Sequence, residues 1–305
     1  MAEMTQNGIL IRDVPTKNIM TKSSLPVGGY SVNPYVGCTH GCKYCYASFM
    51  KRFTGHTEPW GTFLDVKHWP EIKNPQKYRG QRVVIGSVTD GYLPQEEQFC
   101  NTRRLLEQLK DSGAELLICT KSDLVVRDID LLKEMGKVTV SWSINTLDED
   151  FRADMDHAVS IERRLAAMKQ IYDAGIRTVC FIAPVFPGIT DFEAIFHRVR
   201  NQCDLVWLEN LNLRGGFKQS ILDYIGEKHP ALLPLYQEIY NHDRRDYFRS
   251  LEARAERLAA ENDCPFVDNE LPYGRARQGH PVIVDYFYHE EVRGSDNTGH
   301  RNRKA

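Results

Sequence analysis

Strand-like and helix-like segments alternate through the middle of the chain, and this alternation limits the folds that it can adopt. Apolar runs rich in β-branched residues cover residues 82–88, 115–120, 138–144, 178–185 and 205–211. Helical patterns lie between them, at residues 101–109, 128–135, 161–174 and 191–201. Continuous apolar strands joined by helices are typical of a parallel sheet with right-handed crossovers. With the strand-like segment 30–36 there are six such units, fewer than in a closed barrel, so the sequence predicts an α/β fold, a partial (β/α)6 TIM-type barrel.

The flanking segments differ from this repeating core. Residues 1–28 carry polar and turn residues and are expected to form an extended N-terminal arm, which places the barrel core at residues 29–215. A strongly helical pattern at residues 246–261 predicts a helical C-terminal extension over residues 216–293. The polar residues 294–305 are expected to form a disordered tail.

Composition and charge exclude several classes of protein. The chain of 305 residues is 42% hydrophobic and 26% charged, as is typical of a globular protein with a large core. No apolar run approaches the ~20 residues that span a bilayer, and no apolar leader is evident, so we expect a cytoplasmic protein without a membrane partner. The net charge of −2 argues against binding to nucleic acid through overall charge.

Three cysteines after the first strand-like segment carry the strongest chemical signal. Cys38, Cys42 and Cys45 have the spacing C-x3-C-x2-C, and a short loop can bring all three sulfurs to one side. Thiolates are the usual ligands of iron–sulfur clusters, and three ligands leave one iron of a four-iron cluster open for a group that is not protein. Because the loop follows a strand, it is expected at the C-terminal edge of the parallel sheet, where such folds place their functional groups.

Other interpretations of these cysteines must be weighed. A disulfide framework is disfavoured because eight cysteines in 305 residues are sparse. A structural zinc site usually has four ligands, so His40 or His56 would have to complete the tetrahedron. On spacing alone the zinc alternative stays open. The remaining cysteines are scattered, and burial in the core is the default for each: Cys100, Cys119, Cys180, Cys203 and Cys264.

Further motifs make the chain resemble the radical S-adenosylmethionine (SAM) superfamily. Its C-x3-C-x-aromatic-C loop is matched by the three cysteines and Tyr44. The chain is also similar to the branch related to spore photoproduct lyase, in several blocks and in the expected order. These blocks are G-S-V-T-D-G-Y-L-P-Q-E at 86–96, T-K-S at 120–122, S-I-N-T-L-D-E at 143–149, E-R-R-L at 162–165 and A-P-V-F-P-G-I-T-D at 183–191. The P-V-G-G-Y segment at 26–30 and the tail resemble the radical SAM mobile-pair subgroup.

The resemblance implies an enzyme with a 4Fe–4S cluster and SAM as cofactors. In this superfamily the open iron chelates the amino and carboxylate groups of SAM. A reduced cluster donates one electron, which releases methionine and a 5′-deoxyadenosyl radical, and the radical abstracts hydrogen from the substrate. The protein supplies positioning and shielding. Such an enzyme needs a one-electron reductant as its partner, of the flavodoxin or ferredoxin type.

The resemblance also implies which residues form the SAM site, at the ends of successive strands. Asp90 has an alternative role, because it could instead cap the helix that follows. The candidates are Lys121 for the methionine carboxylate, Ser87, Thr89 and Asp90 for the methionine amino group, Ser143 and Asn145 for the ribose or the methionine, and Tyr44 and Ala183 for adenine.

Tyr44 and Tyr46 border the cysteine loop and are the candidate catalytic residues. In spore photoproduct lyase, tyrosines in these positions take part in a radical relay with a cysteine that donates hydrogen. No cysteine lies in segment 87–90 of this chain, and Cys119, one strand over, is a conceivable substitute, so the outcome of the reaction stays open.

We expect a large substrate, a nucleic acid or a peptide, because an open barrel has a wide mouth. The kinship with spore photoproduct lyase favours nucleic acid by fold-level analogy. The alternative function is a non-catalytic iron–sulfur or zinc binding module that acts through a protein partner.

Overall fold

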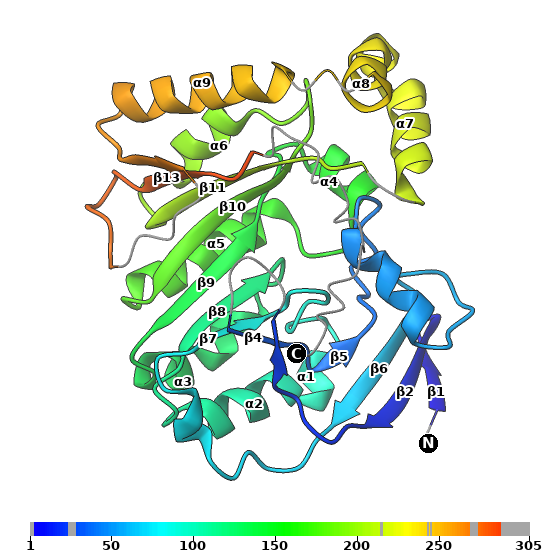
Figure 1. Ribbon diagram of the computed structural model, residues 1–305, viewed down its shortest axis with the longest axis vertical. Coiled ribbons are helices and arrows are strands. Elements are labelled where there is room, and N and C mark those ends of the chain that lie inside the picture. The colour runs from blue at the N-terminus through cyan, green and yellow to red at the C-terminus, as the bar shows by residue number, and fades with distance from the viewer. Residues whose placement is uncertain are drawn as a thin grey trace, which may run out of the picture.

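A nine-stranded sheet forms the centre of the molecule (Figure 1). The computed structural model describes residues 3–23, 29–213, 216–242, 244, 246–268 and 274–287. The strand order is β12-β13-β11-β10-β9-β8-β7-β4-β3, and every neighbouring pair is parallel except β3 and β4. The strands are β3 (Thr21–Lys22), β4 (Tyr30–Val32), β7 (Arg82–Ile85), β8 (Glu115–Thr120), β9 (Val138–Ser143), β10 (Arg177–Val185), β11 (Leu205–Asn210), β12 (Phe266–Asp268) and β13 (Val282–Asp285).

The strands that the alternation predicts lie side by side in chain order. β4, β7, β8, β9, β10 and β11 form one continuous parallel run, which confirms the α/β fold of the partial-barrel type. β7 ends at Ile85, earlier than predicted, because Gly86 turns the chain away with a φ of +92°. A Cβ atom at Gly86 would lie 2.3 Å from the carbonyl oxygen of Cys119, so only glycine fits this turn.

Helices pack against one face of this sheet, called the outer face here. Leucines of α2 and α3, the apolar sides of α5 and α6, and the buried stripe of α9 share one hydrophobic core with the outward-pointing strand residues. The helices are α1 (Glu96–Phe99), α2 (Asn101–Leu109), α3 (Ile129–Glu134), α4 (Glu149–Met155), α5 (Ile161–Asp173), α6 (Phe192–Val199), α7 (Phe217–Lys228), α8 (Leu233–Asn241) and α9 (Asp246–Glu261), with 3-10 helices η1 (Tyr46–Phe53), η2 (Pro75–Tyr78), η3 (Leu124–Asp128) and η4 (Pro230–Leu232).

The opposite face of the sheet, called the inner face, carries a second and smaller apolar cluster. Its buried members alternate with the outward-pointing residues along each strand, as the period of a strand requires. They are Val84, Leu117, Val179, Leu205, Trp207 and Val284. The inner face is therefore apolar, and the polar groups of the candidate site lie at its C-terminal edge.

The N-terminal segment is not the extended arm that its composition predicts. β1 (Glu3–Gln6) and β2 (Ile9–Pro15) form an antiparallel hairpin, and β2 pairs with β6 (Phe63–His68) in a second sheet that β5 (Tyr35–Val36) completes. Asn7 and Gly8 make the turn with φ values of 50° and 76°. This Asn-Gly pair is a strong hairpin signal, which the composition of the segment obscured.

The C-terminal extension is also more than helical. β13 adds to the edge of the main sheet by pairing in parallel with β11, and β12 pairs with β13. The predicted tail at 294–305 lies outside the described residues. In the described part of the chain, no helix has an apolar run long enough to cross a membrane.

Candidate functional site

The cysteine loop, residues 37–45, connects β5 to η1 at the C-terminal edge of the parallel strands. Two backbone hydrogen bonds fasten it to the end of α4. Lys43 N donates to Met155 O at 2.9 Å, and His157 N donates to His40 O at 2.8 Å. The loop is therefore joined to β5 by the chain itself and to the end of α4 by these two hydrogen bonds.

Cys38, Cys42 and Cys45 lie in this loop as free thiols. Cys38 is buried, with 8% of its surface exposed, and the other two are partly exposed. Burial raises the pKa of each thiol, and the neighbouring cysteines raise that of Cys38 further, so the three sulfurs lie close enough to repel one another as thiolates. Among the described residues, no three His, Cys, Asp or Glu side chains converge on a point where one ion would bind.

This arrangement does not suit a zinc ion. A tetrahedral zinc site holds all its ligands on one atom, whereas each thiolate of a 4Fe–4S cluster binds a different iron. Of the two histidines that could complete a tetrahedron, His56 has both ring nitrogens engaged, and His40 has Nε2 engaged and Nδ1 without a partner among the described residues. His40 Nε2 lies 2.9 Å from Asp90 Oδ2, and His56 places one ring nitrogen 2.9 Å from Glu58 and the other 2.9 Å from Asp65.

Asp90, after the end of β7, is a buried anchor with no free oxygen. Besides His40, its carboxylate accepts hydrogen bonds from Thr120 Oγ1 at 2.8 Å, Lys121 N at 2.7 Å and Tyr92 N at 2.8 Å. Burial alone would raise the pKa of Asp90, but His40 and the two backbone N–H groups lower it overall. The carboxylate of Asp90 joins β7, β8 and the cysteine loop, and its contact with SAM stays a prediction. It does not cap the helix that follows, whose N-cap residue is Gln95.

The other two candidates at the end of β7 are engaged in the same way. Thr89 is buried and donates its hydroxyl hydrogen bond to the carbonyl oxygen of Gly37. Ser87 shares hydrogen bonds with Ser31 Oγ and with Asn33 Nδ2. The structure thus assigns Thr89 to holding the loop, and it leaves Ser87 in a hydroxyl and amide cluster.

Lys121 and Asn145, at the ends of β8 and β9, are different because their side chains lack hydrogen-bonding partners. Lys121 Nζ makes no hydrogen bond or ion pair within the described residues and lies 5.8 Å from the centre of the Tyr44 ring. Burial would lower the pKa of Lys121, but nearby Cys42 and Asp156 raise it overall. Asn145 is 3% exposed, and its Nδ2 has no hydrogen-bond partner.

The remaining SAM candidates lie around these two. Ser143 is the last residue of β9 and is partly exposed, and Ala183 is buried in β10 where its pairing with β11 becomes irregular. Tyr44 packs edge-on against Phe186, with ring centres 5.5 Å apart, and belongs to an apolar cluster with α4 and α7. Its position fits a wall beside a ligand.

The two tyrosines that flank Cys45 have different surroundings. Tyr44 is 9% exposed, and burial raises its pKa. Tyr46 is 56% exposed by surface area, yet its hydroxyl is surrounded by protein and donates a hydrogen bond to the carbonyl oxygen of Ser87. Burial of that hydroxyl raises its pKa, and Cys119 and Glu209 add to the effect, so Tyr46 reaches over the inner face. The catalytic role of either tyrosine stays a prediction.

Sequence reasoning missed the ion pair beneath the cysteine loop. Arg164 Nη2 and Asp156 Oδ1 are 2.7 Å apart, and each side chain is 1% exposed. Arg164 also donates to the carbonyl oxygen of Ser143, which ties this pair to the end of β9. Arg164 belongs to the E-R-R-L block, so the sequence marked this residue. Its role could not be inferred from the block, because its partner Asp156 lies eight residues earlier in the chain.

A second hydrogen-bond network, around Glu96 and Tyr92, gives a role to the residues of the block at 86–96 that follow Asp90. Glu96 is fully buried and accepts hydrogen bonds from Thr102 N at 3.0 Å and from Arg127 Nη2 at 2.8 Å, and the Tyr35 hydroxyl donates to it. The Tyr92 hydroxyl donates a hydrogen bond of 3.1 Å to Asp128, a buried residue of η3. These residues brace the segment after β7 and do not face a ligand.

Comparison with known proteins gives the family. A family model described as "Radical SAM superfamily" matches residues 32–199, more than half of the chain. The chain belongs to this superfamily. An uncharacterized protein of Methanocaldococcus jannaschii is 33% identical over 224 residues, which cover 73% of this chain and 85% of the relative. A protein of Pseudomonas phage M6 named radical SAM Nalpha-GlyT isomerase is 27% identical over 175 residues, 56% of this chain and 35% of that protein.

Solved structures show the same fold. Spore photoproduct lyase complexed with dinucleoside spore photoproduct superposes with a TM-score of 0.53 at 16% identity, over 72% of this chain and 66% of that one. The predicted superfamily is thus confirmed, and with it the cofactors that its members use, a 4Fe–4S cluster and SAM. Membership in the mobile-pair subgroup stays a prediction, since residues 24–28 lie outside the described part.

The radical SAM site of this chain fits those cofactors. Buried polar groups in proteins are nearly always hydrogen-bonded. Around the cysteine loop, His40 Nδ1 and Asn145 Nδ2 are buried nitrogen atoms without a hydrogen-bond partner among the described residues. The partly buried Lys121 ammonium makes no hydrogen bond or ion pair there either. A ligand with carboxylate, hydroxyl or sulfide acceptors would satisfy them.

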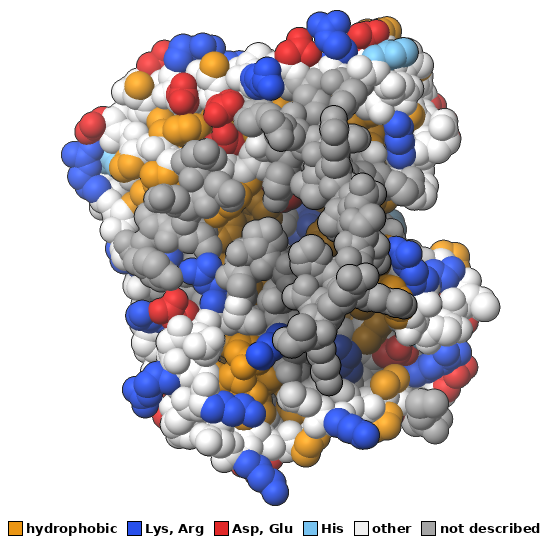
Figure 2. Space-filling model, viewed as in Figure 1, with side chains coloured by type: hydrophobic (Ala, Val, Ile, Leu, Met, Phe, Trp, Pro, Cys, Tyr) orange, Lys and Arg blue, Asp and Glu red, His pale blue; other side chains and the backbone are white. Residues whose placement is uncertain are grey.

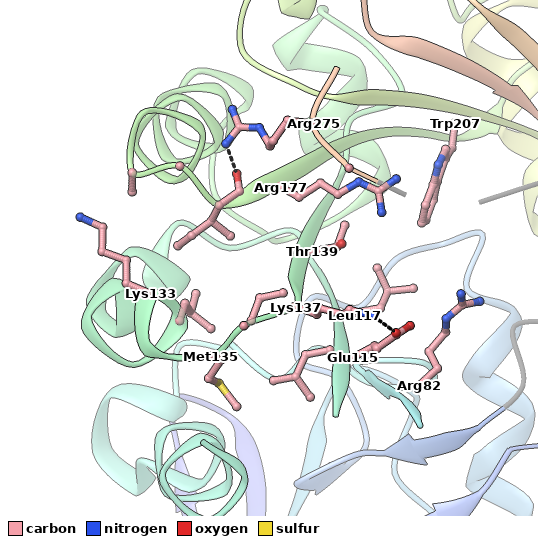
Figure 3. A pocket seen from close by; sticks show the side chains of 18 residues that line it. Arg82, Glu115, Leu117, Lys133, Met135, Lys137, Thr139, Arg177, Trp207 and Arg275 are labelled. Atoms are coloured by element: carbon pink, nitrogen blue, oxygen red, sulfur yellow. Dashed lines mark hydrogen bonds and ion pairs between the residues drawn. The ribbon is translucent and has the colours of Figure 1, made fainter. Parts of the chain in front are cut away.

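A cavity away from the cysteine loop lies at the other end of the strands. It has a volume of about 580 Å³ and is lined by residues at the N-terminal ends of β7 to β10, opposite the cysteine loop (Figure 3). Arg82, Arg177 and Arg275 border it, and the Lys137–Glu115 ion pair and a hydrogen bond from Arg275 to the carbonyl oxygen of Ile176 lie along its wall. Because it is at the wrong end of the strands, it is not the SAM site.

Proposed function

We propose that the protein is a radical SAM enzyme in which Cys38, Cys42 and Cys45 hold the 4Fe–4S cluster and whose substrate is a nucleic acid. The observation that carries the proposal is the pairing of this cysteine loop with two unsatisfied side chains, Lys121 and Asn145, at the ends of adjacent strands. When bound, the cluster supplies the electron that cleaves SAM to methionine and a 5′-deoxyadenosyl radical.

The chain's own residues bind and orient SAM. The Lys121 ammonium binds the methionine carboxylate, because it is a charged group beside the cysteine loop that makes no hydrogen bond or ion pair with the described residues. Asn145 donates its amide hydrogens to an acceptor of the same ligand. Tyr44 and Phe186 form an apolar wall that keeps water from one side. Asp90 and Arg164 hold the strand ends in place.

The choice of a nucleic-acid substrate takes its support from the comparisons. The similar solved structure holds a dinucleoside, and the phage relative is named an isomerase of Nalpha-GlyT. On the face shown in Figure 2, the described basic side chains are dispersed among acidic ones rather than gathered in a stripe. That pattern favours recognition of an exposed nucleotide over binding along a duplex backbone. A one-electron reductant is the required partner, and we propose one of the flavodoxin or ferredoxin type.

The test begins with protein reconstituted with iron and sulfide without oxygen. The proposal expects a brown protein with about four irons per chain that cleaves SAM when given dithionite. Deuterium-labelled cellular nucleic acid should then pass its label to 5′-deoxyadenosine. A colourless protein that is inert to SAM would support a zinc or structural binding module instead. SAM cleavage with label from a peptide pool but none from nucleic acid would overturn the substrate class alone.

A further inference from the structure

Glu209 has a carboxyl group on the inner face that no other group engages among the residues the structure describes. Leu205 and Trp207 of β11 belong to the inner apolar cluster, while Val206 and Leu208 belong to the outer core. Strand residues alternate between faces, so Glu209 points to the inner face at the C-terminal end of β11. This is the edge at which the cysteine loop lies.

The surroundings of Glu209 are apolar. Its carboxyl makes no hydrogen bond or ion pair in the part of the chain that the structure describes, and burial raises its pKa to about 7. Two titratable groups face it. One is the Tyr46 hydroxyl from η1. The other is Tyr286, which lies beside Glu209 because the preceding residue, Asp285 of β13, pairs with Leu208. From β8, Cys119 lies beyond Tyr46. None of these is a cation that would balance a carboxylate.

An aromatic wall lies directly below Glu209 on the same face. The ring centres of Phe181 and Trp207 are 5.5 Å apart, and those of Trp207 and Tyr286 are 5.9 Å apart. Trp207 is 5% exposed, and its Nε1 donor has no hydrogen-bond partner. Trp207 and Glu209 are two residues apart in β11, so this indole donor and the Glu209 carboxyl lie on the same face of one strand.

We propose that Glu209 is the specificity-determining residue of the substrate site, where its carboxyl group on the inner face of β11 pairs with the hydrogen-bonding edge of a nucleobase that rests against the aromatic wall. This rests on the proposed nucleic-acid substrate. A protonated carboxyl offers one donor and one acceptor side by side, which matches the adjacent donor and acceptor of a base edge. Glu209 is partly buried, and a carboxyl group that is partly withdrawn from water without a partner is unfavourable, so a ligand that supplies both partners gains affinity.

The test measures binding of fluorescent single-stranded DNA of mixed sequence to the reconstituted holoprotein without oxygen, one unit below and one unit above the pKa of Glu209. Because the neutral form binds, affinity of the wild type should fall about tenfold as the pH rises through that pKa. Glu209→Gln keeps a donor and an acceptor, so it should bind nearly as well at both pH values. Glu209→Leu should bind about tenfold more weakly at both. Glu227→Gln, an exposed carboxyl on α7, is the matched control.

The outcomes separate the two proposals. If wild type binds the DNA but Glu209→Gln retains the same pH dependence, Glu209 is not the recognising group although the substrate class stands. An oligonucleotide without bases that binds with the same pH dependence overturns base recognition. If wild type binds no DNA at either pH, the proposed substrate fails and the pairing fails with it. A midpoint of urea unfolding for Glu209→Leu that matches the wild type shows that the fold is intact.

Discussion

The end of β7 and the ends of β8 and β9 lie side by side, yet their polar residues do different things. After β7, Thr89 donates its hydrogen bond to a backbone oxygen, and the Asp90 carboxylate accepts hydrogen bonds from groups of the protein itself. After β8 and β9, Lys121 and Asn145 leave theirs open. Both groups lie in blocks shared with the same family, so similarity of sequence alone does not separate a residue that builds the site from one that binds the ligand. The state of its hydrogen bonds does.

The largest effect on activity is expected from a substitution in the cysteine loop. Cys42→Ser is expected to abolish SAM cleavage and to lower the iron content of reconstituted protein, because serine does not replace a thiolate as a cluster ligand. Iron analysis and the yield of 5′-deoxyadenosine check this. Cys100→Ser, at an exposed cysteine outside the site, is the control and should keep both. A Cys42→Ser protein with full iron would mean that the cluster has other ligands.

Asp90→Asn tests the β7 side of the comparison. The amide would direct a donor at groups that are themselves donors, so the free energy of unfolding should fall by about 2–4 kcal/mol. Urea denaturation of the protein without cofactors measures this. Asp173→Asn, in an exposed pair with Lys169, should change it by less than about 0.5 kcal/mol. If Asp90→Asn left stability unchanged and removed only SAM binding, our assignment of Asp90 as an anchor would be wrong.

How much of this could be predicted from the sequence depends on how local the determining interactions are. The bounds of α2 and β8 match their predicted ranges because one amphipathic or apolar run defines each. The pairing of β13 with β11 escaped prediction because it joins segments more than 70 residues apart. In the site, spacing identified the cysteines, but nothing in the block at 86–96 indicates that His40, Thr120 and a backbone amide would surround Asp90.

Lys121→Met tests the β8 side. Methionine keeps the length and apolar stem but removes the charge, so the KM for SAM should rise about 10- to 100-fold, the worth of one charge-assisted hydrogen bond. Stability without cofactors should change little, since no bond within the protein is lost. Lys43→Met removes a neighbouring loop lysine that stacks on Tyr224 and should leave the KM unchanged. Equal effects of the two substitutions would point to general charge rather than to a specific contact.

Asn145→Ala should have the smallest effect on the KM for SAM, and it distinguishes most clearly between a residue that binds the ligand and one that builds the site. Loss of one neutral hydrogen bond to SAM costs about 1 kcal/mol, which is a roughly fivefold rise in KM. The unfolding free energy should not show the matching loss of a hydrogen bond, because Nδ2 has none in the protein alone, while the bond from Thr190 Oγ1 goes to the backbone oxygen of Asn145 and survives the substitution. A thermal shift upon adding SAM compares the two directly. If the variant lost stability without SAM but kept its KM, Asn145 would belong with Asp90 among the residues that build the site.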